Sequence, residues 1–271
     1  MNALLTGAAG GLGGYIAAAL AAEGVNLALS DLAEPEDLVG RVRAQGVSAE
    51  ALAADLTDTA GLEMLVRHAE QAVGPIDILV NNAGLEFMGP FTGQTRQQLE
   101  QITAVNLLAL MELTRIVLPG MLKRGRGHVV NIASLAGKVP APYFHTYNAT
   151  KHGVVGFTHS LRGELAETPV SISAICPGFI SRVGMLGRIE HMVEVPSSLG
   201  TMPPEKVGEA VVRAIREDVP EAIVSKRPVR PLIAFASVFP GAMQRVTRRM
   251  GVADAALEFA EAEGRLGQPE P

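Results

Sequence analysis

Several residue types are scarce in this 271-residue chain, and each scarcity excludes a class of protein. The single cysteine, Cys176, allows no internal disulfide. No Lys or Arg precedes Arg41, so the N-terminal segment lacks the positively charged start of a secretory signal. The net charge is −5 and no long basic run occurs, which excludes nucleic acid as the main partner because phosphates need clustered cations. No spacing of His, Cys and Asp suggests a metal site. We therefore expect a cytoplasmic protein that binds neither metal nor nucleic acid.

Apolar runs of strand length alternate with segments of helix length along most of the chain. The length and the 48% hydrophobic content suit one large α/β core. Strands separated by helices form a parallel sheet that is covered on both faces. We predict a doubly wound parallel sheet, a Rossmann fold of about seven strands, over residues 1–225. The expected strands are residues 2–5, 26–30, 49–53, 76–80, 129–132, 170–175 and 222–224.

A glycine-rich turn follows the first expected strand. It contains Gly7, Gly10, Gly11 and Gly13 with Leu12 between the last two, and a helix is expected over 15–23. Glycines let the backbone approach a pyrophosphate closely, and the helix start offers N–H groups to the anion. Taken alone such a cluster is also typical of a simple tight turn.

The second expected strand ends in Asp31, eighteen residues after Gly13. A carboxylate at this place accepts hydrogen bonds from an adenosine ribose, so turn and carboxylate together predict a dinucleotide site. Because a carboxylate repels a 2′-phosphate and no cation lies nearby in the sequence, we expect NAD in preference to NADP. The alternative is that Asp31 only caps a helix or a turn.

A tyrosine and a lysine lie one helical turn apart, at Tyr147 and Lys151, with Ser134 thirteen residues before the tyrosine. Positions i and i+4 share a helix face, so the ammonium is expected to favour the ionised phenol and to lower its pKa. This makes Tyr147 a candidate acid/base. The alternative for such a pair is a surface helix, and for Ser134 a cap at the end of a strand.

Six motifs resemble those of the short-chain dehydrogenases/reductases and follow one another in the same order as in that family. The resemblance covers nearly the whole chain, up to about residue 225. The turn from Thr6 to Gly13 resembles the cofactor turn of that family. Asp55-Leu56 resembles the adenine-side contact of the family. Residues 81–84, with Asn82, Ala83 and Gly84, resemble its strand-four motif, and Pro177-Gly178 resembles its nicotinamide-side turn. Its catalytic residues correspond to Asn106, Ser134, Tyr147 and Lys151. Asp55 is equally compatible with capping the next helix.

The resemblance implies hydride transfer between a nicotinamide cofactor and a secondary alcohol or ketone, with Tyr147 as acid/base. Ser134 is expected to hold the substrate oxygen, Lys151 to contact the nicotinamide ribose, and Asn106 to hold a water beside the lysine. It also implies a dimer or tetramer through the helices that hold Asn106 and Tyr147. Two alternatives stay open: a nucleotide-sugar epimerase or dehydratase, because Gly7, Gly10 and Gly13 fit that spacing too, and an NAD-binding sensor without catalysis.

The chain departs from the family pattern after Gly178. Where many relatives carry a threonine for the nicotinamide carboxamide, this chain has Arg182, with Ser181 one position out of register. We expect a lid over 179–201. The lid and the segments expected to lie beside it at the pocket mouth are rich in apolar residues. This favours a lipophilic substrate or, equally, packing of the lid on the core. These residues are Phe87, Met88, Leu135, Val139, Phe144, Phe179, Met185, Leu186 and Met192.

The last 46 residues, 226–271, are expected to form an extension on the same domain. Their apolar run is too short to span a membrane but is flanked by arginines. Such a segment can lie in a membrane interface. We expect the extension to cover the pocket mouth or to form a subunit contact, in preference to this peripheral membrane contact.

Overall fold

The computed structural model describes residues 1–189, 191, 200–249 and 251–266. Its centre is a parallel sheet of seven strands in the order β3-β2-β1-β4-β5-β6-β7, so the predicted doubly wound Rossmann fold is confirmed. The order reverses between β1 and β4, and a ligand crevice is expected at that point. The strands are β1 (Asn2–Thr6), β2 (Asn26–Asp31), β3 (Ala49–Ala53), β4 (Ile78–Asn81), β5 (Gly127–Ile132), β6 (Val170–Pro177) and β7 (Glu221–Val224).

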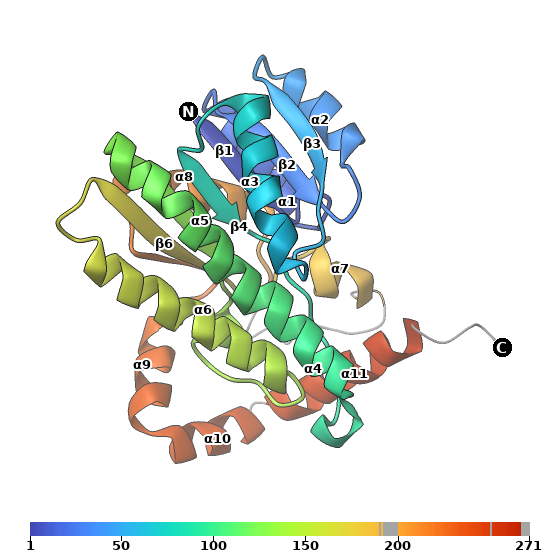
Figure 1. Cartoon of the computed structure of the whole chain (residues 1–271). Coiled ribbons are helices and arrows are strands. Elements are labelled where there is room, and N and C mark those ends of the chain that lie inside the picture. Colours follow the sequence, from blue (N-terminus) through green and yellow to red (C-terminus); the bar gives the residue numbers. More distant parts are fainter. Residues whose placement is uncertain (190, 192–199, 250, 267–271) are drawn as a thin grey trace.

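Helices cover both faces of the sheet (Figure 1). One layer consists of α1 (Gly13–Ala22), α2 (Glu36–Arg43) and α8 (Glu205–Glu217). The other consists of α3 (Thr59–Val73), α4 (Arg96–Thr103), α5 (Ala109–Arg124) and α6 (His145–Glu164). Four more helices, drawn in yellow and red, gather at one end of the sheet: α7 (Gly184–Ile189), α9 (Arg230–Val238), α10 (Pro240–Arg249) and α11 (Val252–Leu266).

Most strand residues are apolar because alternate side chains enter opposite cores, although a few buried polar residues occur in the strands, among them Thr6, His128 and Ser173. In β1, Leu5 packs beneath α1 and α8 whereas Leu4 packs beneath α3 and α5. The same alternation recurs in β4, where Val80 and Leu79 point to opposite layers. A strand buried on both faces places apolar side chains in both cores, which explains why largely apolar runs predicted this sheet.

The helix from Arg96 to Arg124 is long and apolar enough to cross a membrane by length and composition alone. It packs on the sheet instead, with Leu113, Val117 and Met121 buried in the core. Leu108 and Met111 on the same helix remain exposed. The dimer or tetramer expected through this helix stays a prediction.

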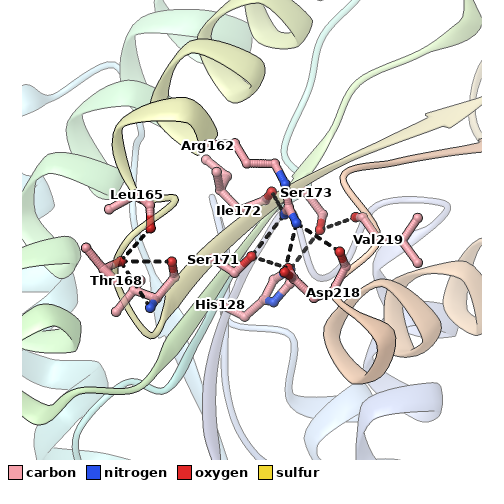
Figure 2. Close-up of polar contacts among 10 residues, drawn as sticks. His128, Arg162, Leu165, Thr168, Ser171, Ile172, Ser173, Asp218 and Val219 are labelled. Atoms are coloured by element: carbon pink, nitrogen blue, oxygen red, sulfur yellow. Dashed lines mark hydrogen bonds and ion pairs between the residues drawn. The ribbon is translucent and has the colours of Figure 1, made fainter.

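A polar cluster lies where β5 and β6 begin, at the opposite end of the sheet from α9–α11 (Figure 2). Arg162 of α6 donates to the carboxylate of Asp218 at 2.8 Å, and Ser171 binds the same carboxylate. His128 Nε2 lies 2.8 Å from Ser173 Oγ. Burial lowers the pKa of His128 to about 4, because the apolar strands around it disfavour the charged ring.

This histidine gives stability a defined pH dependence. Its native pKa lies below the unfolded value, so the unfolded chain takes up a proton between pH 6.5 and about 4 that the native chain does not. The free energy of unfolding is therefore expected to fall by about 3 kcal/mol across that window from this residue. In His128→Gln this contribution is absent, which shows in denaturant unfolding curves at a series of pH values. His68→Gln, at an exposed histidine, is the control and keeps the wild-type slope. An equally steep fall of the free energy of unfolding towards acid pH in His128→Gln would contradict the assignment of this pH dependence to His128.

Candidate active site

A cavity of about 1080 Å³ opens at the carboxyl ends of the strands, at the point where the strand order reverses. Its wall contains segments that are distant in the sequence: the turn after β1, the ends of β2 to β6, the start of α6, and parts of α7, α9 and α10. The cavity therefore has the place and size of the principal ligand site of a doubly wound fold.

The glycine turn forms one end of the cavity. Gly7 has a φ of +64°, and a Cβ there would lie 2.6 Å from the Cα of Ala83. A Cβ on Gly13 would lie 2.4 Å from the carbonyl oxygen of Ala8, so only glycine permits this packing. Gly7, Gly10, Gly11 and Leu12 line the cavity, whereas Gly13 lies beneath the turn. No side chain caps helix α1, so an anion can bind those N–H groups at its start that make no backbone bond; the N–H of Gly13 is already bound by the carbonyl oxygen of Gly10 at 3.0 Å. This cradle fits a pyrophosphate.

Asn82 ties the glycine turn to the end of β4. Its Nδ2 donates to the carbonyl oxygens of Thr6 at 3.0 Å and of Gly7 at 2.8 Å. In return, Thr6 Oγ1 accepts from the backbone N–H groups of Asn82 and Ala83. Asn82, Ala83 and Gly84 all line the cavity, and a Cβ on Gly84 would lie 3.6 Å from Lys151 Nζ. The backbone here runs directly past the lysine head.

Asp31 lines the cavity at the end of β2. One carboxylate oxygen accepts from the N–H of Ala9 at 2.8 Å, and the other accepts from the N–H of Leu32 at 2.8 Å. These two bonds hold a negative charge beside the glycine turn. The guanidinium of Arg41 lies near the start of α1, 3.9 Å from where a Cβ on Gly14 would be.

Asp55 and Leu56 line the same end of the cavity after β3. The Asp55 carboxylate accepts from both the N–H and the hydroxyl of Thr57 at 2.8 Å, and these bonds lower the pKa of Asp55. The next helix, α3, is capped by Asp58, whose side chain accepts from Ala60 N–H at 3.1 Å. The alternative role of Asp55 as helix cap is therefore wrong, and its contact to adenosine stays a prediction.

Ser134, Tyr147 and Lys151 meet in the middle of the cavity. Ser134 follows β5; its Oγ accepts from the N–H of Ala136 at 3.1 Å and donates to the carbonyl oxygen of Pro177 at 3.5 Å, and the hydroxyl acts to lower the pKa of Tyr147. Lys151 is only 4% exposed; its Nζ donates to the carbonyl oxygen of Ile132 at 2.8 Å and lies 5.6 Å from the ring centroid of Tyr147. The expected i and i+4 pair thus shares one face of α6.

The pKa of Tyr147 differs from the sequence expectation. Burial of the phenol raises it above its ordinary value, the carboxylate of Glu86 raises it further, and the hydrogen bond from Ser134 opposes both. The prediction that this pKa is lowered is wrong, because the net direction is upward. The lysine is itself buried, which lowers its pKa to about 8, and its head is directed to a backbone carbonyl. The phenol is therefore protonated at neutral pH.

Asn106 lies in a π-helical turn, Ala104–Leu108, between α4 and α5. Its Oδ1 accepts from the N–H of Leu85 at 2.7 Å, and its Nδ2 donates to the carbonyl oxygen of Leu85 at 2.8 Å and to Thr150 Oγ1 at 3.3 Å. The side chain joins the loop after β4 to α6 close to Lys151. These bonds show a positioning geometry, and the expected role of Asn106 in holding a water stays a prediction.

Glu86 and Arg188 were missed by the sequence analysis. Both line the cavity, and Arg188 Nη2 lies 2.6 Å from Glu86 Oε1. The pair joins the loop after β4 to the lid helix α7. Glu86 follows the small-residue run of 81–84 by two positions, and a charged residue next to such a run is the only sequence signal that marks it.

Pro177 and Gly178 line the cavity after β6, but the two candidates for a carboxamide clamp do not. Ser181 Oγ is directed to the carbonyl oxygen of Met202 at 3.4 Å. Arg182 has a φ of +66° and pairs with Glu205 at 2.7 Å. Of the expected lid over 179–201, residues 190 and 192–199 lie outside the described residues.

Most of the wall near Tyr147 is apolar. Of the nine apolar residues singled out from the sequence, Leu135, Val139, Phe144, Phe179 and Leu186 line the cavity. Phe87 does not line the cavity, and Met88 packs beside Phe144. Met192 and the side chain of Met185 lie outside the described part of the chain. The C-terminal extension adds Val229, Leu232, Met243, Thr247 and Val252, so it covers part of the cavity mouth.

Fold and site together define a dinucleotide-binding Rossmann protein with a serine, a tyrosine and a lysine at its crevice. A family model described as short chain dehydrogenase matches residues 1–194, and the chain belongs to that family. It is therefore an oxidoreductase by family.

Two curated relatives and one solved structure illustrate the similarity. The chain is 41% identical over 268 residues to ketoacyl reductase HetN of Nostoc sp., with 95% of this chain and 92% of the relative covered. It is 34% identical over 232 residues to D-beta-hydroxybutyrate dehydrogenase of Cupriavidus necator, covering 85% and 86%. A crystal structure of a variant actinorhodin polyketide ketoreductase with NADPH superposes with a TM-score of 0.76 at 31% identity, covering 83% of this chain and 95% of that one.

Glu86 is expected to set the pH range of the site. Because its carboxylate raises the pKa of both Tyr147 and Lys151, Glu86→Gln should lower both pKa values. The alkaline limb of the pH profile for carbonyl reduction then moves to lower pH. Glu100→Gln, which removes another carboxylate lining the cavity, is the matched control and leaves that limb in place. A shift to higher pH in Glu86→Gln would refute the assignment.

Proposed function

We propose that this chain catalyses hydride transfer between NAD and a hydrophobic secondary alcohol or ketone, with Tyr147 as acid/base. The observation that carries the proposal is the group of Ser134, Tyr147 and Lys151, which faces a mostly apolar cavity beside the glycine cradle. When bound, the cofactor supplies the hydride for reduction or accepts it in oxidation. The chain supplies position, charge and the proton.

In the reducing direction the protonated phenol of Tyr147 donates its proton to the carbonyl oxygen as the carbon receives the hydride. Ser134 donates a hydrogen bond to the same oxygen and stabilises the charge that develops there. Lys151 supplies positive charge beside the phenolate that remains, and the carbonyl oxygen of Ile132 holds its ammonium at 2.8 Å. Oxidation runs through the same groups in reverse. The raised pKa of Tyr147 keeps the phenol in the protonated form from which reduction starts.

The apolar wall supports a lipophilic substrate. Tyr147 packs in an apolar cluster with Phe144, Phe179, Leu186 and Phe259, and further apolar side chains from β5, β6, α9 and α10 line the same cavity. Relatives named ketoacyl reductase suggest a ketoacyl group as one such substrate. An acyl chain extending from the reacting carbonyl would lie along Leu135, Phe144 and Phe179.

Replacing the phenol tests the mechanism. Tyr147→Phe is expected to lower kcat/KM for a ketone or ketoacyl thioester by at least about a hundredfold, since a positioned general acid contributes that much. NADH binding, followed by cofactor fluorescence, is retained because the cradle is untouched. Tyr143→Phe, four residues away and packed beside Phe144, is the control and stays active. Activity near that of wild type in Tyr147→Phe would rule out the proposed proton donor.

The preference for NAD rests on the carboxylate of Asp31. Asp31→Ser removes the charge that would repel a 2′-phosphate and removes an acceptor for the ribose. The ratio of kcat/KM for NADH over NADPH is expected to fall by about 10- to 100-fold. Asp37→Ser, on the first turn of α2, removes the same charge away from the cavity and leaves the ratio unchanged. A wild-type enzyme that already prefers NADPH would contradict the preference outright.

A further inference from the structure

Positive charge is concentrated in the first part of the C-terminal extension, before Asp254. Residues 222–253 contain six cations and no Asp or Glu, although the chain as a whole carries a net charge of −5. All 28 acidic residues lie elsewhere. The cations are Lys226, Arg227, Arg230, Arg245, Arg248 and Arg249.

The outer face of α9 is apolar and exposed. Phe235, Val238 and Phe239 follow the i, i+3, i+4 spacing, so they share one side of the helix end. Their exposed fractions are 39%, 67% and 56%, and the rings of Phe235 and Phe239 lie 5.5 Å apart. Three large exposed apolar side chains within five residues form a patch of the kind that marks an interaction surface.

The outer face of α10 is cationic and repeats the same spacing. Arg245, Arg248 and Arg249 are exposed, whereas Met243 on the opposite side is buried. Within the described part of the chain, none of these three arginines forms an ion pair. An aromatic pair next to a row of arginines is the pattern of a surface that binds anionic lipid headgroups.

The same two helices line the cavity through Leu232 of α9 and through Met243 and Thr247 of α10. Leu232 lies three residues before Phe235 on α9, so the exposed aromatic patch adjoins the cavity wall. In Figure 1 the two helices project from the end of the sheet at which the cavity opens. A surface bound at this place would lie next to the mouth.

We propose that the outer face of α9 and α10, formed by Phe235, Val238, Phe239, Arg245, Arg248 and Arg249, docks on the surface of an anionic lipid bilayer. The aromatic rings enter the headgroup region and the arginines contact lipid phosphates and carboxylates. Helices of nine and ten residues are too short to span a bilayer, so the contact is peripheral. A second copy of the same face is a poor occupant, because a twofold contact would bring arginines against arginines.

The experiment measures co-sedimentation of the full chain with phosphatidylcholine vesicles, with and without phosphatidylserine, in the absence of cofactor and substrate. Binding is expected only with phosphatidylserine and is expected to weaken as salt rises. Arg248→Ala with Arg249→Ala should lower the partition coefficient about 30-fold, since each cation near such a surface contributes about fivefold. Phe235→Ser with Phe239→Ser should lower it about tenfold.

Arg43→Ala with Arg216→Ala removes the same charge on α2 and α8 and is the matched control, with binding retained. Thermal unfolding and light scattering on every variant separate a loss of folding or a change of assembly from a loss of docking. Absence of phosphatidylserine-dependent binding at low salt overturns the proposal, as does binding that both double variants retain. A lower molar mass of the Phe235→Ser, Phe239→Ser variant assigns the face to a subunit contact instead. Because no turnover is measured, failure of the proposed reaction leaves this result unaffected.

Discussion

The hydrogen bonds between Thr6 and the segment after β4 are the constraint on which the site depends. Asn82 binds the two carbonyl oxygens at the end of β1, and Thr6 Oγ1 binds the two N–H groups that follow β4. These four bonds hold the glycine turn open at the place where the strand order reverses. Both the cradle and the backbone beside Lys151 take their positions from these four bonds. One group of polar contacts therefore aligns the two ends of the cavity.

The sheet could be predicted because its strands are buried on both faces and therefore read as continuous apolar runs. The expected strand at 49–53 has the observed bounds, and the other six differ at one or both ends by one or two residues. The π-turn at Asn106 could not be predicted, since no residue pattern distinguishes it from the α-helices on either side. Its cause is tertiary: Leu85 on one loop and Thr150 on another helix together bind the Asn106 amide.

The site residues came from motifs, whereas their electrostatics depend on neighbours that no motif marks. The pair at Tyr147 and Lys151 was read from spacing alone, and spacing says nothing of burial or of Glu86. Once the loop after β4 brings this carboxylate beside the phenol, its effect adds to desolvation and exceeds that of Ser134. Local sequence therefore located the acid/base, and only the assembled fold determined its protonation state.

The order of the strands has a consequence for how the protein acquires its site. Asn81 pairs in register with Asn131, and Ile132 with Ile175, so neighbours in the sheet are about 50 and 43 residues apart in the chain. Loops of that length close late and slowly. The carbonyl that holds Lys151, the cradle and the phenol come together only when β1, β4 and β5 have paired. Nucleotide affinity is thus a property of the completed sheet, and a dinucleotide in the cell would act as a selective stabiliser of fully folded chains over any partly folded form.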